Sequence, residues 1–378
     1  MKDGFQLESI MFKFGPKSFH LQWHITERCN LRCRHCYQDP ALIKNELDIR
    51  DLSRILKNFI KQIKIWRLPK EAVRISFTGG EPLIKKGFLK LLQKCYQNRD
   101  KFHYGILTNG IFLDEKTVAD FKKLKVDYVQ ISLEGMEKTN DYLRGKGVFR
   151  KVVEGIELLK GKNIDANLSM TVSRVNLKDV PAVINLSRKL GVPLGMRRLV
   201  PFGRGKMLKK FILTPEEVKK LWNYVYKLKQ NLGSEIGLGC EDGMLVQDFP
   251  QYRPGECSAG YLSFTVLPNA DVYPCRRLPI LAGNLLKESF ETVYNSKPLR
   301  ELRNLHNIND VCYSCPHSEK CRGGAKCLAF SYFQDTSAPD PQCWRLFGKE
   351  LAEPGLKWRN SVENREERLN FRWIEETA

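Results

Sequence analysis

The chain lacks any apolar run near the roughly 18 residues that a membrane-spanning helix needs. Its first residues, Met1-Lys2-Asp3-Gly4, include an acid and lead into no apolar segment, so they do not have the form of a secretory signal peptide. No internal repeat is visible beyond an alternation of strand and helix patterns. These absences argue against a membrane-spanning or secreted protein, and we expect a cytoplasmic one.

A concentrated basic tract is also absent, although the chain is strongly positive. Its 378 residues include 63 Lys and Arg against 43 Asp and Glu, a formal net charge of +20. The cations are dispersed, as at Lys122-Lys123, and no basic block is interleaved with aromatic residues. We therefore expect no nucleic-acid groove, but a basic surface that suits an acidic electron carrier or an acidic peptide.

Cysteine is plentiful, at twelve residues, and in a reducing compartment this indicates metal binding or catalysis rather than disulfides. Cys29, Cys33 and Cys36 follow a C-x3-C-x2-C spacing that can hold three corners of a 4Fe–4S cluster. Such clusters are normally held by four cysteines, so one iron would stay open to a small molecule. An open position is typical of catalytic rather than structural sites. The alternatives are a structural zinc knot and scattered buried thiols.

Strand and helix patterns alternate through the first half of the chain. Strand-like segments cover 19–25, 73–78, 104–108, 128–133, 164–172 and 194–200. Helical spacing of apolar residues, with glycine stops, covers 51–66, 86–95, 114–124, 149–160 and 179–190. Six such units predict an α/β fold with a parallel sheet, and six rather than eight indicates an incomplete (β/α)6 TIM-like barrel.

Several polar segments follow these strands directly. The cysteine loop, Gly79-Gly80-Glu81-Pro82, Thr108-Asn109-Gly110 and Ser132-Leu133-Glu134 all fall at carboxyl ends of predicted strands. Sites in such barrels lie at the C-terminal ends of the strands. The sequence therefore predicts that these four segments share one pocket.

The cysteine spacing, with Tyr37 directly after the third cysteine, resembles the signature of the radical S-adenosylmethionine (radical SAM) enzymes. Gly79, Gly80, Glu81 and the following proline match the family's GGEP motif, which meets the amino group of SAM. Taken alone, the motif is equally a glycine-rich turn between strand and helix. It follows the cysteines in the family's order, which favours the functional interpretation.

The same resemblance implies further contacts with SAM. Ser132 and Glu134 resemble the strand that contacts its ribose and methionine parts. Arg144 resembles an arginine that pairs with the SAM carboxylate, a role for which a guanidinium offers two parallel hydrogen bonds. Asn109 is expected to reach the adenosine, or simply to make a turn. The resemblance further implies that the reduced cluster cleaves SAM and that a 5′-deoxyadenosyl radical abstracts a substrate hydrogen, with flavodoxin or ferredoxin as electron donor.

The C-terminal cysteines closely resemble the SPASM domain, which holds two auxiliary 4Fe–4S clusters. By this resemblance Cys312, Cys315, Cys321 and Cys343 hold the outer cluster. The inner cluster is assigned Cys257, Cys275 and Cys327, with either Cys240 or no protein group as its fourth ligand. A double zinc ribbon is the alternative. Two positions depart from the family pattern: Ala270 stands where glycine is usual, and Cys327 comes two residues late. Cys95, on a helix among apolar residues, is expected to be a core thiol.

These patterns divide the chain into five parts. We expect an N-terminal extension over 1–18, the radical SAM core over 19–213, a linking helix and loop over 214–256, the SPASM domain with a β-hairpin and short helices over 257–345, and a charged tail over 346–378. Only about 18 residues precede the first strand, so no peptide-binding winged-helix domain is expected. A leader peptide would then need a separate binding protein.

Three functions remain open from the sequence. The first is a radical SAM oxidoreductase that modifies a peptide or protein, and the second is an enzyme that matures a porphyrin, quinone or metal cofactor. The third, a non-enzymatic iron–sulfur electron-transfer or binding protein, would need no SAM pocket. Within the first class, sulfatase-maturing enzymes place an Asp after the second SPASM cysteine, where this chain has Arg276. The sequence identifies neither the substrate nor a catalytic acid or base.

Overall fold

The computed structural model describes residues 16–38, 45–232, 236–238, 243–250, 257–304 and 308–348. Cys240 and most of the predicted N-terminal extension and charged tail lie outside these ranges. Within them, no helix is long and apolar enough to cross a bilayer.

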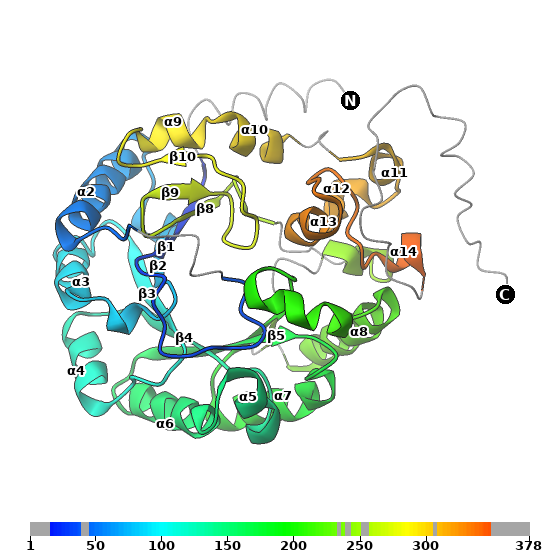
Figure 1. Ribbon diagram of the computed structural model, residues 1–378, viewed down its shortest axis with the longest axis horizontal. Coiled ribbons are helices and arrows are strands. Elements are labelled where there is room, and N and C mark those ends of the chain that lie inside the picture. The colour runs from blue at the N-terminus through cyan, green and yellow to red at the C-terminus, as the bar shows by residue number, and fades with distance from the viewer. Residues whose placement is uncertain are drawn as a thin grey trace.

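A single curved sheet organises the molecule (Figure 1). Its ten strands run in the order β10-β9-β8-β1-β2-β3-β4-β5-β6-β7. Neighbours from β8 through β1 to β7 pair in parallel, whereas β8, β9 and β10 pair antiparallel. The strands are β1 Phe19–His24, β2 Val73–Thr78, β3 His103–Thr108, β4 Tyr128–Ser132, β5 Asp165–Val172, β6 Leu194–Arg198, β7 Ile236–Leu238, β8 Ser263–Val266, β9 Asp271–Tyr273 and β10 Gly283–Asn284.

Crossover helices cover the outer face of this sheet, as parallel strands require (Figure 1). Those of the first half are α2 Ile49–Ile65, α3 Phe88–Gln97, α4 Glu115–Lys123, α5 Glu137–Arg144, α6 Val148–Gly161, α7 Val180–Leu190 and α8 Pro215–Leu232. The C-terminal helices are α9 Phe290–Tyr294, α10 Lys297–Arg303, α11 Asp310–Tyr313, α12 Ser318–Cys321, α13 Lys326–Phe333 and α14 Trp344–Phe347. The sheet remains open, which confirms the incomplete TIM-like barrel predicted from six strand–helix units.

Local sequence explains the helix boundaries. The Asp48 side chain accepts hydrogen bonds from the backbone N–H groups of Arg50 and Asp51 and so caps α2. Thr214 and Glu217 exchange hydrogen bonds at the start of α8, which is a capping box. Helix α7 ends at Gly191 in the left-handed region, with φ of +64°.

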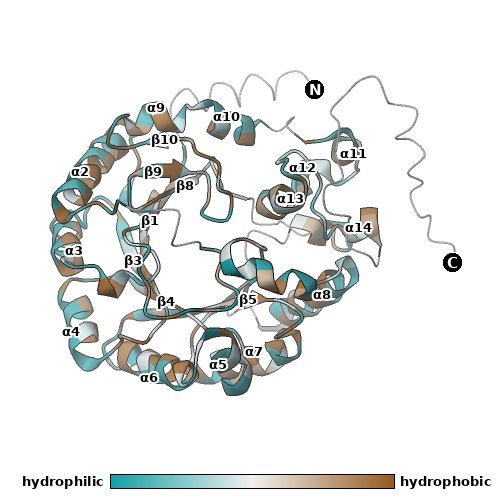
Figure 2. Cartoon of the chain, in the orientation of Figure 1, coloured by the Kyte–Doolittle hydropathy of each residue, from teal (hydrophilic) through white to brown (hydrophobic). Residues whose placement is uncertain are grey.

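The main core lies between the helices and the outer face of the sheet, where the apolar faces of the helices point inward (Figure 2). On β1, Phe19, Leu21 and Trp23 are buried in this core, and Cys95 of α3 joins it as the predicted core thiol. Along β1 the alternate residues His20 and Gln22 instead line the inner cavity, as the two-residue period of a strand dictates. Apolar packing therefore holds the sheet from outside and leaves its inner face polar.

Three features of the fold were not expected from the sequence. Helix α5 forms between β4 and α6, β7 extends the parallel sheet beyond β6, and β8 hydrogen-bonds in parallel to β1. The hairpin of the predicted SPASM domain, β8 and β9, therefore continues the sheet of the barrel. At the turn of this hairpin Ala270 adopts φ of +69°, a conformation that favours glycine.

Candidate active site

The carboxyl ends of the strands surround one cavity of about 1460 Å³. It extends from the cysteine loop to residues at the opposite end of the barrel, such as Glu71 and Asp165. The predicted site residues that line it are Cys29, Cys33, Cys36, Gly79, Gly80, Asn109, Ser132, Glu134, Arg144 and Cys275. The structure thus brings together the four polar segments that the sequence placed at strand ends.

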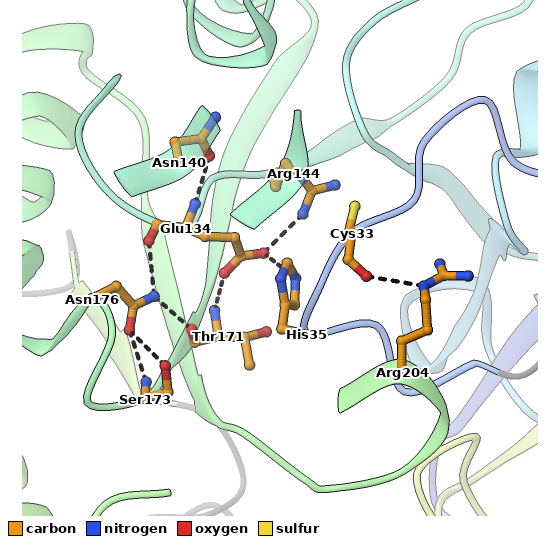
Figure 3. Close-up of polar contacts among 9 residues, drawn as sticks. All are labelled: Cys33, His35, Glu134, Asn140, Arg144, Thr171, Ser173, Asn176 and Arg204. Carbon is orange, nitrogen blue, oxygen red and sulfur yellow. Dashed lines mark hydrogen bonds and ion pairs between the residues drawn. The ribbon is translucent and has the colours of Figure 1, made fainter. Parts of the chain in front are cut away.

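The cysteine loop is held through three of its backbone groups. The N–H of Arg34 donates to the carbonyl of Leu143 at 2.8 Å, and the N–H of Gly205 donates to that of Cys36 at 2.9 Å. Arg204 Nε donates to the carbonyl of Cys33 at 3.1 Å (Figure 3). Helix α5 and the 3-10 segment Gly203–Phe211 therefore fix the loop without using its sulfurs.

The three sulfurs of the loop remain available as ligands. Burial raises the pKa values of Cys29 and Cys36, and the neighbouring charge of Cys33 raises them further. The influence of Cys33 on both neighbours places the three thiols within electrostatic range of one another. A bound iron cluster would reverse the effect, because a coordinating thiol is deprotonated. The donor set and its position on the cavity wall fit a three-cysteine cluster that faces open space.

The two glycines of the GGEP motif permit a close approach of backbone to backbone. A Cβ on Gly79 would lie 2.3 Å from the carbonyl oxygen of Thr26, and one on Gly80 would lie 2.2 Å from that of Arg28. The N–H of Gly80 donates to Thr26 and the N–H of Glu81 donates to Arg28, both at 2.8 Å. These bonds place the motif directly against the cysteine loop.

Glu81 lies behind the cavity wall, not in its lining. Its carboxylate accepts hydrogen bonds from Thr108 Oγ1 and the N–H of Asn109, each at 2.8 Å, and from the N–H of Leu83 at 3.2 Å. Burial nevertheless raises the pKa of Glu81 to about 7. The Asn109 side chain donates to Asn30 Oδ1 at 2.8 Å, which joins the β3 end to the cysteine loop.

Glu134, at the end of β4, is the centre of a buried polar network (Figure 3). Its carboxylate accepts from Arg144 Nη1 at 2.8 Å and from the N–H of Thr171 at 2.6 Å. His35 Nε2 lies 3.1 Å from the same oxygen that Arg144 contacts. Glu134 also lines the cavity, so the contact with SAM that the resemblance implies stays a prediction.

One small cavity in the C-terminal half is lined by Cys312, Cys315, Cys321 and Cys343. These are the four residues assigned to the outer cluster. Burial, followed by the charge of Cys343, raises the pKa values of Cys312 and Cys321. The assigned outer ligands are therefore gathered, although they are spread over 32 positions of sequence.

The residues assigned to the inner cluster are only partly described. Cys275 and Cys327 pack in one cluster with Leu278 and Leu328. Burial lowers the pKa of the Lys326 amine, and the charge of Cys257 opposes this effect. Cys312 and Cys321 of the outer set act on the same amine in the same direction as Cys257. Cys240 falls outside the described residues, so its predicted role as a fourth ligand stays a prediction.

A single zinc ion is a poor fit to these sulfurs. Zinc needs its ligand sulfurs at about 2.3 Å from one metal, in a tetrahedron. Among the described residues, no three His, Cys, Asp or Glu side chains converge to hold one ion. Groups of cysteines around shared cavities suit a larger iron–sulfur cluster better.

Sequence reasoning missed two parts of the site. Helix α5, which carries Arg144, has Met136 at its N-cap with no capping hydrogen bond, so no start signal marked it. His35 lies between the second and third cysteines and contacts Glu134, which follows the distant strand β4. No local pattern predicts that contact. The position of a histidine inside the cysteine motif was the available signal.

Comparisons with known proteins match this geometry. A family model described as the radical SAM superfamily matches residues 23–187, and one described as an iron–sulfur cluster-binding domain, SPASM, matches residues 257–316. The mycofactocin maturase MftC of Mycolicibacterium smegmatis is 29% identical over 352 residues, covering 88% of this chain and 84% of that protein. The AdoMet-dependent heme synthase of Methanosarcina barkeri is 24% identical over 353 residues, covering 87% and 97%.

Solved structures share the fold. Streptococcus suis SuiB bound to S-adenosylmethionine has a TM-score of 0.68 at 17% identity, covering 90% of this chain and 81% of SuiB. anSMEcpe with bound AdoMet also has a TM-score of 0.68, at 19% identity, covering 86% and 93%. The two family models therefore show an enzyme with a radical SAM domain, which uses a 4Fe–4S cluster and SAM, and a C-terminal SPASM domain for auxiliary iron–sulfur clusters.

Proposed function

We propose that the enzyme cleaves SAM reductively and abstracts a hydrogen atom from a peptide or protein substrate bound in the barrel. Cys29, Cys33 and Cys36 hold the cluster that faces the cavity. Gly79 and Gly80 line the cavity beside the cysteine loop, where SAM would bind, and Arg144 pairs with its carboxylate. When bound, the cluster and SAM supply the radical, while the chain orients both and excludes water.

Support for a peptide substrate comes first from the size of the cavity. Its volume of about 1460 Å³ exceeds the ~300–1,000 Å³ typical of sites for one small ligand. Room therefore remains beside SAM for a second molecule. Among the similar proteins, MftC is named a maturase, and SuiB has been solved with its precursor peptide SuiA.

The polar walls of the deeper cavity favour a peptide over a porphyrin as the substrate. His20 Nε2 lies 2.6 Å from Ser76 Oγ, which lies 2.5 Å from Tyr128 Oη. The Tyr128 ring reaches across β3 because Gly105 has no side chain, and a Cβ there would lie 2.4 Å from the ring. Such hydroxyl and imidazole groups can bond a peptide backbone, whereas a porphyrin needs broad apolar walls.

The sulfatase-maturing branch is disfavoured by the residue after Cys275. Arg276 occupies the position where that branch has an Asp base, and it is buried in an ion pair with Glu27. A cation in this position cannot accept the proton from a substrate. The base of this enzyme, if one is used, belongs to another part of the cavity.

Two partners and a location follow from this proposal. An acidic flavodoxin or ferredoxin suits a chain with a formal net charge of +20 as electron donor. A separate protein would bind any leader segment of the substrate peptide. The reaction would take place in the cytoplasm, where low-potential donors and free thiols persist.

A cofactor precursor is the second candidate substrate, and the heme synthase relative favours it because 97% of that protein is covered. Untargeted mass spectrometry of cells that lack the gene distinguishes the two. Complementation with the wild type should restore a mass-shifted peptide, and complementation with Cys33→Ala should not. Restoration of a porphyrin or quinone alone would support the cofactor function instead.

A further inference from the structure

We propose that Glu134 is a positioning residue that fixes the orientation of the Arg144 guanidinium for the carboxylate of SAM. This inference rests on the proposed function, because it concerns the same SAM site. It assigns to Glu134 an action through Arg144 in place of direct contact with the ligand.

The guanidinium of Arg144 uses only part of its hydrogen-bonding capacity within the protein. Arg144 is only 8% exposed, and its Nη1 donates to Glu134 Oε1 at 2.8 Å (Figure 3). Its buried Nε has no hydrogen-bond partner in the part of the chain that the structure describes. An unpaired buried donor is unfavourable, so a bound acceptor at this nitrogen would be stabilising. The edge formed by Nε and Nη2 presents two parallel N–H groups, the pattern that matches a carboxylate.

The guanidinium nitrogens of Arg144 that do not bind Glu134 lie on the side of the cluster ligands. Arg144 lines the cavity together with Cys33 and Cys36. Figure 3 shows one guanidinium nitrogen on Glu134 and another directed toward the Cys33 side chain. A carboxylate held by the free edge would thus lie beside the sulfurs that hold the cluster.

Glu134 is itself held in place by hydrogen bonds to its backbone and side chain. The N–H of Glu134 donates to Asn140 Oδ1 at 2.9 Å, and its carbonyl accepts from Asn176 Nδ2 at 2.8 Å. Its second carboxylate oxygen accepts from the N–H of Thr171. Backbone and side chain are therefore both fixed, from α5 and from the end of β5.

Glu134 is also linked to the cysteine loop. His35 Nε2 lies 3.1 Å from Glu134 Oε1, the atom that also holds Arg144. His35 stands between Cys33 and Cys36, so one oxygen atom joins the arginine to the loop that carries the sulfurs. Glu134 therefore adds a side-chain link between the arginine and the loop to the backbone bond from Arg34 to Leu143.

Positioning and simple electrostatics predict opposite outcomes when Glu134 is changed. Glu134→Gln removes a negative charge beside Arg144, so electrostatics alone predicts tighter binding of an anionic group. If Glu134 positions the guanidinium, the same change weakens binding. Glu134→Asp keeps the charge but withdraws the carboxylate by one methylene, so only the positioning role predicts a loss.

The test measures the dissociation constants of SAM and of 5′-methylthioadenosine, which lacks the whole amino-acid part of SAM, the carboxylate included, on anaerobically reconstituted protein by calorimetry. Both Glu134 variants should bind SAM roughly ten- to a hundredfold more weakly, the range for a charged hydrogen bond. Their affinity for 5′-methylthioadenosine should equal that of the wild type. Glu137→Gln, which breaks an exposed pair with Arg150, should change neither constant.

Tighter binding of SAM by Glu134→Gln would overturn the proposal, and so would equal losses for the two ligands or loss of iron from the variants. Arg144→Lys keeps the test decisive if the Glu134 variants do not fold. It retains the charge but lacks the planar fork, so it should lose SAM affinity and keep that for 5′-methylthioadenosine. Unchanged SAM binding by Arg144→Lys contradicts the inference. A wild type that binds no SAM refutes the proposed function itself.

Discussion

Arg276 Nη2 lies 2.8 and 2.9 Å from the two carboxylate oxygens of Glu27, in a pair that is almost fully buried. Glu27 precedes the cysteine loop by two residues, and Arg276 directly follows Cys275. The pair therefore joins the loop proposed to hold the SAM-binding cluster to the segment proposed to hold the inner auxiliary cluster. Together with the pairing of β1 with β8, it fixes the two halves of the molecule against each other.

Breaking this pair should destabilise the enzyme strongly. Glu27→Gln leaves a buried guanidinium without its counter-charge, which is expected to lower the free energy of unfolding by about 3–5 kcal/mol. Urea unfolding followed by circular dichroism measures the change. Glu137→Gln, in an exposed pair, should lower it by less than about 1 kcal/mol. Equal, small effects of the two changes would show that the buried pair is not a structural link.

Gly80→Ala should displace the cysteine loop. The added Cβ would lie 2.2 Å from the Arg28 carbonyl oxygen, and backbone cannot move aside as a flexible side chain can. We expect a loss of about 1–3 kcal/mol in stability, together with reduced iron in the reconstituted protein. Iron analysis and thermal unfolding measure both.

Gly161→Ala is the matched control for that change, because a Cβ there meets nothing within 4 Å. Gly161 lies in α6, where alanine should stabilise by up to about 1 kcal/mol. If Gly80→Ala behaves like Gly161→Ala, the close approach of the GGEP motif to the loop has no structural importance.

The carboxyl of Glu81 should make stability fall as pH rises. Burial raises its pKa from 4.5 to about 7, so between these values the folded chain binds a proton that the unfolded chain has lost. The stabilisation is complete below the unfolded pKa and disappears as pH rises through the folded value. This stabilisation of the folded state is on the order of 3 kcal/mol.

Comparison with Glu81→Gln isolates this effect, because the amide does not titrate. The free energy of unfolding of the wild type, minus that of Glu81→Gln, should decrease between about pH 5 and about pH 8. Denaturant unfolding at several pH values provides the measurement. A difference that stays constant with pH contradicts the assigned shift.

The strands and crossover helices could be predicted because their signals are local. Buried strands such as β2 and capped helices such as α2 carry their apolar pattern and end signals within a few residues. Strand β7 is three residues long, too short for any periodicity. The pairing of β8 with β1 joins segments more than 200 residues apart, which no local pattern can specify.

The site could be predicted in its residue types and only partly in its contacts. Cysteine spacing and the GGEP motif placed the sulfurs and glycines on one cavity because strand ends in such a fold converge. The partners of Glu134 come from α5, from β5 and from the cysteine loop, and they meet only after folding. Long-range hydrogen bonds of this kind require the structure.

Reductive cleavage of SAM by the wild type and by Cys33→Ala tests the central claim most directly. After anaerobic reconstitution and reduction with dithionite, chromatography with mass spectrometry measures 5′-deoxyadenosine, and iron analysis measures the clusters. The wild type should hold about twelve irons and form 5′-deoxyadenosine, whereas Cys33→Ala should form none and retain about eight irons in its C-terminal clusters. Formation of 5′-deoxyadenosine by Cys33→Ala, or a wild type with about four irons, would contradict the account.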